Sequence, residues 1–182
     1  MNLKNLTFTS LLSISVLILL TSVKIYKSEI PLIYNLTHIL KGGEVQNPIP
    51  LEMYENLEKY SEKYEIPKHV FYNIAYLETR YRGPFDWNYN HKRTSSAGAL
   101  GPMQIMPSTA DYICKEDISN EKLKNDIELN ISISAMLLKQ LYDKYKNWKL
   151  VCGYYNTGRP IINKYAEFCA TNKDYQENWL EP

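Results

Sequence analysis

The chain has 182 residues, which suits one domain of ordinary size with additional segments. The composition is globular, with 45% hydrophobic and 23% charged residues, and the formal net charge of +1 argues against nucleic acid as a partner. The three cysteines, Cys114, Cys152 and Cys169, include no CxxC pair and so argue against a zinc site. One pair could form a disulfide in an oxidising compartment and leave one thiol free, but the sequence does not say which.

The N-terminal region predicts a membrane anchor. Leu6 to Val23 are 18 residues without a charge, at the short end of a membrane-spanning helix, and no small-x-small cleavage site follows them. We therefore predict a short tail at 1–5, an uncleaved signal anchor at 6–23 and a tether at 24–50 rich in proline and glycine. A cleaved signal peptide is the main alternative, which would give a secreted form. Residues 51–182 are then the globular domain.

Hydrophobic periodicity predicts a mainly α-helical domain. Leu51 to Tyr64 is amphipathic, and Pro67 to Tyr81 forms a second helix that Gly83 and Pro84 end. Residues 85–96 read as a loop. Further helices are predicted from Pro107 to about Cys114, from Asn125 to Tyr145, from Trp148 to Tyr155 and from Pro160 to Cys169. No alternating strand pattern interrupts this series.

The second of these helices carries a carboxylate in an unusual place. Glu78 follows Phe71 by seven residues and Ile74 by four, so it extends the apolar face of the helix. Desolvation there would raise the pKa of the carboxyl and suit it to donate a proton. The alternative is a structural ion pair with Arg80 or Arg82, which the helix alone favours.

A second notable stretch, GALGPMQIMPSTA, spans Gly98 to Ala110. Two glycines three residues apart and a following proline indicate a tight backbone path rather than a regular helix. Gln104 lies between Met103 and Ile105, and a long amide among apolar neighbours needs hydrogen-bond partners or a ligand.

Three pieces in this order resemble the soluble lytic transglycosylase family of lysozyme-like, peptidoglycan-cleaving enzymes. They are ETRY with Glu78, then GALGPMQIMPSTA, then GYYNTG with Tyr155 and Asn156. The family shows E-S-x-F, then G-A-x-G-L-M-Q-x-M-P-x-T-A, then A-Y-N-A-G. The resemblance covers residues 51–170 and implies a lysozyme-like helical domain with a deep glycan-binding groove.

The resemblance also implies roles for individual residues. Glu78 corresponds to the single catalytic glutamate, and Ser95 to a serine that steadies it. The remaining matches imply contact with the sugars, and they are Met103, Gln104, Tyr155, Asn156 and, less directly, Tyr165.

The chain departs from the family pattern at a few positions. Thr79 replaces serine after the glutamate, Pro102 replaces leucine, and Tyr154 and Thr157 replace the alanines that flank Tyr-Asn. The gap between the glutamate and Gly98 is also longer than in many relatives, and its aromatic residues could add stacking surface over the groove.

The implied reaction is cleavage of the β-1,4 bond between N-acetylmuramic acid and N-acetylglucosamine, with a 1,6-anhydromuramic acid end as product and no metal or cofactor. One alternative is a hydrolase of goose-lysozyme type, which needs a second carboxylate such as Asp86. Another is a non-catalytic glycan-binding scaffold. The expected partners are glycan strands and, through the N-terminal helix, the cytoplasmic membrane, with the domain facing the cell wall of a bacterium or serving phage lysis.

Overall fold

The computed structural model describes residues 48–173, so the predicted anchor and nearly all of the predicted tether lie outside the described residues. Within this range no helix is long and apolar enough to cross a membrane. The helices are α3 (Ile49–Lys63), α4 (Lys68–Thr79), α5 (Pro107–Cys114), α6 (Asn120–Asn125), α7 (Ile127–Tyr145), α8 (Trp148–Thr157) and α9 (Lys164–Thr171). Residues 80–106 form a long connection with isolated bridges at Thr94–Leu100 and Leu100–Ile105. The prediction of a mainly helical domain is confirmed.

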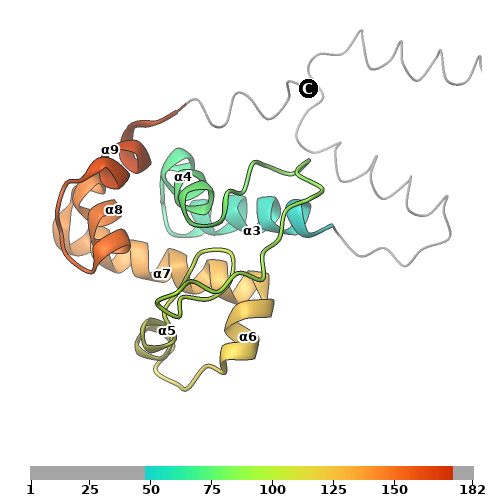
Figure 1. Ribbon diagram of the computed structural model, residues 1–182. Helices are drawn as coiled ribbons and strands as arrows, with labels where there is room; N and C mark the ends of the chain where they lie inside the picture. The colour runs from blue at the N-terminus through green and yellow to red at the C-terminus, as the bar shows by residue number, and fades with distance from the viewer. Residues whose placement is uncertain (1–47, 174–182) are drawn as a thin grey trace, which may run out of the picture. The chain divides into compact units, whose positions relative to one another are not determined.

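Helix α7 runs across the domain, with α3, α4 and α9 on one side of it and α5 and α6 on the other in the view of Figure 1. Helix α7 packs against α3 and α8, and α4 packs against α3 and α9. Val70, Phe71 and Ile74 of the apolar face predicted for α4 are fully buried, and Leu77 is partly buried. It shares one hydrophobic core with Ile131 and Leu138 of α7, so the residue that extends this face stands at the edge of the core.

Three details differ from the sequence-based predictions. Helix α3 starts at Ile49 rather than Leu51, because a proline within the first turn lacks only an N–H that would have no partner there. Helix α6 was not predicted, since six residues are too short for a periodic pattern. The segment 160–163 was predicted to be helical but is not. Helix α9 begins later, because Asn163 caps it by accepting a hydrogen bond from the Ala166 N–H at 2.8 Å.

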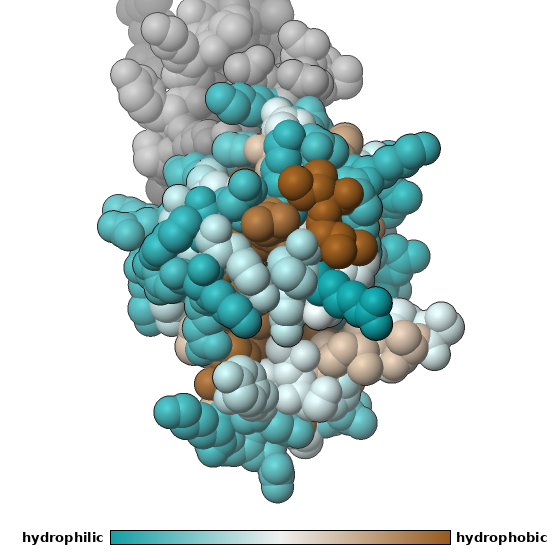
Figure 2. Space-filling view, turned by 90° about the vertical axis from the view of Figure 1, so that its left-hand side faces the viewer, coloured by the Kyte–Doolittle hydropathy of each residue, from teal (hydrophilic) through white to brown (hydrophobic). Residues whose placement is uncertain are grey.

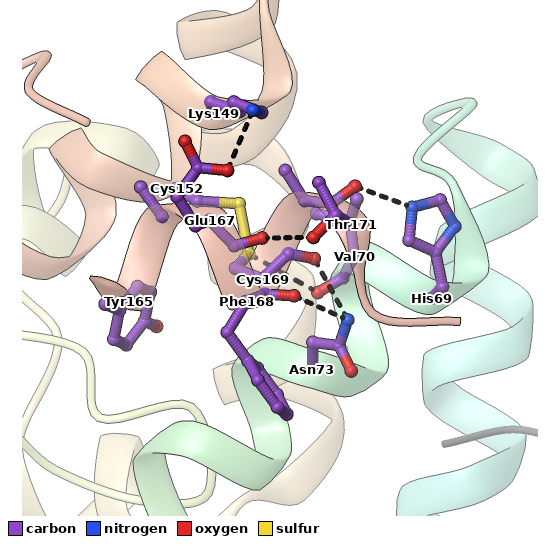
Figure 3. Close-up of a disulfide and its surroundings, with 12 residues drawn as sticks. His69, Val70, Asn73, Lys149, Cys152, Tyr165, Glu167, Phe168, Cys169 and Thr171 are labelled. Atoms are coloured by element: carbon purple, nitrogen blue, oxygen red, sulfur yellow. Dashed lines mark hydrogen bonds and ion pairs between the residues drawn. A yellow bond between two sulfur atoms is a disulfide. The ribbon is translucent and has the colours of Figure 1, made fainter. Parts of the chain in front are cut away.

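Helix α9 is attached to its neighbours by several different interactions (Figure 3). A disulfide joins Cys169 to Cys152 of α8, with their Cα atoms 6.2 Å apart, and leaves Cys114 as the free cysteine of residues 48–173. From α4, the Asn73 side-chain amide donates to the carbonyl oxygens of Cys169 at 3.0 Å and Asn172 at 2.7 Å. These bonds satisfy carbonyl groups at the end of α9 that have no partner within the helix, so α9 is fixed to both α4 and α8.

Candidate active site

Glu78 lies in the last turn of α4, which ends where Arg80 adopts a left-handed conformation with φ of 63°. Its side chain is largely removed from solvent, and this burial raises the pKa of the carboxyl above its usual value. The Tyr165 hydroxyl of α9 donates to Glu78 Oε1 at 2.6 Å, which lowers the pKa by less than burial raises it. The carboxyl therefore holds its proton to a higher pH than an exposed glutamate.

Tyr155 of α8 lies close enough to Glu78 to feel its charge, and it bonds to the Gly98–Ala110 segment. Its hydroxyl donates to the Met103 carbonyl oxygen at 2.7 Å and lies 3.0 Å from the Ser134 hydroxyl of α7. Burial, and then the negative charge of Glu78, raise the pKa of Tyr155, and the same two causes raise the pKa of Tyr165. Both phenols therefore stay protonated at neutral pH beside the glutamate.

Asn130 of α7 holds the Gly98–Ala110 segment in place. Its side chain is fully buried, accepts a hydrogen bond from the Met103 N–H at 2.9 Å, and donates to the Leu100 and Leu123 carbonyl oxygens, each at 2.9 Å. Gly101 passes so close that an added Cβ would lie 2.5 Å from the Asn130 amide nitrogen, and its φ is +75°. The sequence offered one signal for this role, a polar residue within the apolar stripe of α7.

Thr79 joins the end of α4 to the same segment. Its hydroxyl lies 2.8 Å from the Pro102 carbonyl oxygen and 2.7 Å from the Tyr89 hydroxyl. A serine would supply the same hydroxyl, so the departure from the family pattern at this position keeps the polar function. Because Thr79 is buried and adjacent to Glu78, this link also limits how far the catalytic candidate can move relative to the loop.

Three other predicted site residues have partners in their own local structure. The Ser95 hydroxyl accepts the Ala99 N–H at 2.9 Å, the Gln104 amide donates to the Gly101 carbonyl oxygen at 2.8 Å, and Asn156 Oδ1 accepts from Asn163 at 3.1 Å. The hydroxyl that contacts Glu78 belongs to Tyr165, so a steadying role for Ser95 stays a prediction. The structure brings together Glu78, Tyr165, Tyr155 and Met103, and their contacts with sugar stay predictions.

The hydrogen bond between Asn156 and Asn163 closes the connection from α8 to α9. The connection exposes Ile161 and Ile162. The surface on the side of α8 and α9 is otherwise mostly hydrophilic, with small hydrophobic patches (Figure 2). The connection crosses Gly153 so closely that an added Cβ would lie 1.7 Å from the Ile161 carbonyl oxygen. Glycine is therefore required at this position of α8 to let the chain return toward Glu78.

Comparison with known proteins agrees with this geometry. Residues 55–178 match the family model of the Transglycosylase SLT domain. The chain belongs to this family. A solved structure of the 70-kDa soluble lytic transglycosylase in complex with bulgecin A is 28% identical, with a TM-score of 0.51, and the match covers 66% of this chain and 19% of that one. An inactive mutant of the lytic transglycosylase Slt from Pseudomonas aeruginosa is 19% identical, with a TM-score of 0.47 and coverage of 68% and 21%.

The chain therefore spans about a fifth of the length of both solved structures. The match to the 70-kDa transglycosylase covers the helical domain described above. The predicted lysozyme-like fold is therefore confirmed for this domain. The residues that the resemblance assigned to the site fall inside the matched range, from Glu78 to Tyr165.

Proposed function

We propose that this chain is a peptidoglycan lytic transglycosylase. It cleaves the β-1,4 bond between N-acetylmuramic acid and N-acetylglucosamine and leaves a 1,6-anhydromuramic acid end. The observation that carries the proposal is the Glu78 carboxyl, desolvated at the end of α4 and hydrogen bonded by Tyr165, in a chain of the SLT family. A carboxyl whose pKa is raised by burial suits the general acid of a glycosidic cleavage.

The reaction uses one carboxyl group twice. Protonated Glu78 donates its proton to the glycosidic oxygen as the bond to C1 of the muramyl residue breaks. The N-acetyl group of the substrate stabilises the positive charge that develops at C1. Ionised Glu78 then accepts the proton of the C6 hydroxyl, whose oxygen bonds to C1, so that no water is consumed and Glu78 regains its proton.

The arrangement around Glu78 supports both halves of this cycle. Burial favours the protonated form before cleavage, whereas the hydroxyl of Tyr165 stabilises the carboxylate that cleavage leaves behind. The two effects oppose each other, so burial supports the donation step and Tyr165 supports the carboxylate that accepts the proton back.

Hydrolysis of the same bond is the less favoured reaction. It needs a second carboxylate to activate water, and the candidate was Asp86. Asp86 lines a cavity together with Arg80, Arg82 and Arg93, and Glu78 is not among the residues that line this cavity. This setting gives Asp86 positively charged neighbours rather than a place opposite the general acid.

We also propose that the domain faces the cell wall, anchored in the cytoplasmic membrane through residues 6–23. The disulfide between Cys152 and Cys169 supports a location outside the cytoplasm, because disulfides persist in oxidising compartments. Protease treatment of intact spheroplasts tests the orientation, since an outward-facing domain is digested and an inward-facing one is protected.

The activity is tested with Glu78→Gln, which keeps the shape of the side chain and removes the proton. We expect turnover on purified sacculi to fall by at least about 10²-fold, while Glu62→Gln, an exposed change on α3, leaves it as in the wild type. Mass spectrometry of released muropeptides identifies the reaction: anhydro ends are expected. Reducing muramyl ends would mean hydrolysis, and sacculus binding without release would mean a scaffold.

A further inference from the structure

A cavity of about 320 Å³ lies between the end of α4 and the loop that follows it. Its lining includes Thr79, Arg80, Arg82, Asp86, Tyr89 and Arg93, and we call it the arginine cavity. Since Thr79 is the residue after Glu78, the arginine cavity reaches the end of the helix that carries the general acid.

The charge of the arginine cavity is concentrated and unpaired. The chain has four arginines, and three of them line this one cavity. All the ion pairs found between residues 48 and 173 use lysine, so none of the three guanidinium groups has a carboxylate within ion-pair distance there. Against Asp86 they leave a formal excess of two positive charges.

Among residues 48–173, the contacts that hold the walls of the arginine cavity do not use the guanidinium nitrogens as hydrogen-bond donors. The Thr79 and Tyr89 hydroxyls lie 2.7 Å apart and the Tyr89 ring packs edge-on against Tyr81 at 5.1 Å. The Arg80 guanidinium lies 5.1 Å from the centre of the Tyr76 ring. The backbone of Arg93 accepts the Gly101 N–H at 2.9 Å, so the loop is fixed while the arginine donors remain available.

We propose that the arginine cavity binds a carboxylate of the peptide stem that muramic acid carries in peptidoglycan. This inference rests on the proposed function. Cleavage at C1 of muramic acid places that sugar at Glu78, and the stem is attached to the same sugar through its lactyl group. Peptide stems carry carboxylates, and a planar guanidinium is the side chain that binds a carboxylate through two parallel hydrogen bonds.

The binding would make this enzyme prefer glycan that still carries peptide. A charge-assisted hydrogen bond is stronger than a neutral one, so losing two arginines should reduce the preference by about tenfold or more. A peptide-free glycan gains nothing from the arginine cavity, so the preference is measured as the ratio of kcat/KM on the two substrates.

The test uses the double variant Arg82→Gln/Arg93→Gln in the full chain, with soluble glycan strands that bear stems and the same strands after an amidase has removed them. Lys122→Gln/Lys139→Gln removes the same charge from α6 and α7 and controls for general attraction to an anionic polymer. We expect the wild type and the lysine variant to share a ratio well above one, and the arginine variant to fall toward one. A wild-type ratio near one, or an equal fall in both variants, would overturn the proposal.

A binding measurement separates this inference from the proposed activity. Free stem tetrapeptide is titrated by NMR into Glu78→Gln and into Glu78→Gln/Arg82→Gln/Arg93→Gln. We expect shifts in residues 79–93 of the first protein and an affinity at least about tenfold weaker in the second. Inorganic phosphate as the titrant tests for another anion: binding of phosphate without binding of tetrapeptide would overturn the proposal. If no protein forms anhydro ends, the activity assignment fails and the peptide titration still decides this inference.

Discussion

Two parts of the site hold their shape by different means. The first, which we call the helical wall, consists of α4 and α9. Glu78 and Tyr165 stand on helices whose backbone groups are mostly bonded within each helix, and α9 is joined to α8 by a disulfide and to α4 by Asn73. The second part, residues 98–106 or the loop wall, has only isolated bridges, and side chains from other elements, Asn130 above all, satisfy several of the remaining backbone groups. The helical wall is held by packing and a covalent link, whereas the loop wall is held by a few backbone bonds and by single polar side chains.

This difference predicts where each wall is vulnerable. A buried backbone group that loses its partner costs free energy without any compensating contact with water. Each side chain that satisfies the loop wall therefore carries a large share of its stability. In the helical wall, by contrast, stability is distributed over a core of many apolar side chains and one disulfide.

The largest effect is expected from Asn130→Ala. The change removes the Asn130 bonds to the Met103 N–H and to the Leu100 and Leu123 carbonyl oxygens, and the Leu100 oxygen keeps only the Ile105 N–H. At about 1–3 kcal/mol for each of the two groups that lose this partner without such a replacement, we expect a loss of about 2–6 kcal/mol in the free energy of unfolding. Urea denaturation measures it. Asn56→Ala is the control, because that amide donates to Glu52 of its own helix; an equal loss in both variants would refute the special role of Asn130.

Breaking the disulfide should come next. The bond closes a separation of 17 residues, and the double variant Cys152→Ser/Cys169→Ser should lose about 3 kcal/mol. Since α9 carries Tyr165, activity near the melting temperature should fall with stability. Cys114→Ser changes the unpaired cysteine and serves as the control. Comparable melting temperatures with and without a reductant would contradict a stabilising disulfide.

Tyr165→Phe tests the contact between the two helices of the helical wall. Without the phenol, the carboxylate that forms during the reaction loses a hydrogen bond, and we expect kcat to fall by about tenfold. The pKa of Glu78 should rise, because the bond from Tyr165 lowers it. The alkaline limb of the pH profile should then move to higher pH. Tyr112→Phe, on an exposed ring, is the control, and a lower kcat with an unmoved limb would indicate a merely structural role for Tyr165.

The helical wall was largely predictable from the sequence, and the loop wall was not. The spacing of Phe71, Ile74 and Glu78 placed the carboxyl on the buried face of α4, because helical periodicity fixes which residues share a face. The resemblance supplied Tyr155 and Tyr165. Asn130 is a polar residue in an apolar stripe, and nothing in the sequence shows that it bonds to backbone groups of Leu100 and Met103, 30 and 27 residues away.

The cysteine pairing and the arginine cavity show the same limit. The count of three cysteines allowed one pair with one free thiol but did not select it, and the packing of α9 on α8 brings Cys152 and Cys169 together. Arg80 and Arg82 were considered as partners for Glu78, but in the structure they line a cavity with Arg93 instead. Which side chains of an irregular loop come together depends on its turns, and turns have no repeating pattern in the sequence that would predict this.

The smallest expected effect is the decrease in the free energy of unfolding that the buried Glu78 carboxyl causes when it ionises. Folding raises the pKa of Glu78 above its usual value of 4.5, so between the two pKa values the folded state binds more protons than the unfolded state. The free energy of unfolding therefore decreases as pH rises through this interval. Glu78→Gln removes the titrating group while its amide oxygen can still accept from Tyr165.

The variant that abolishes catalysis should therefore be the more stable protein at pH 8. We expect its melting temperature to exceed that of the wild type by about 2–4 °C for each kcal/mol that ionised Glu78 costs, and the excess to vanish below about pH 4, where both states of the wild type are protonated. Calorimetry from about pH 3 to 8 follows the difference, with Glu62→Gln as an exposed comparison. A difference that stays constant or changes sign would mean that the surroundings of Glu78 compensate the cost of burying its ionised form. Ionised Glu78 would then not destabilise the fold.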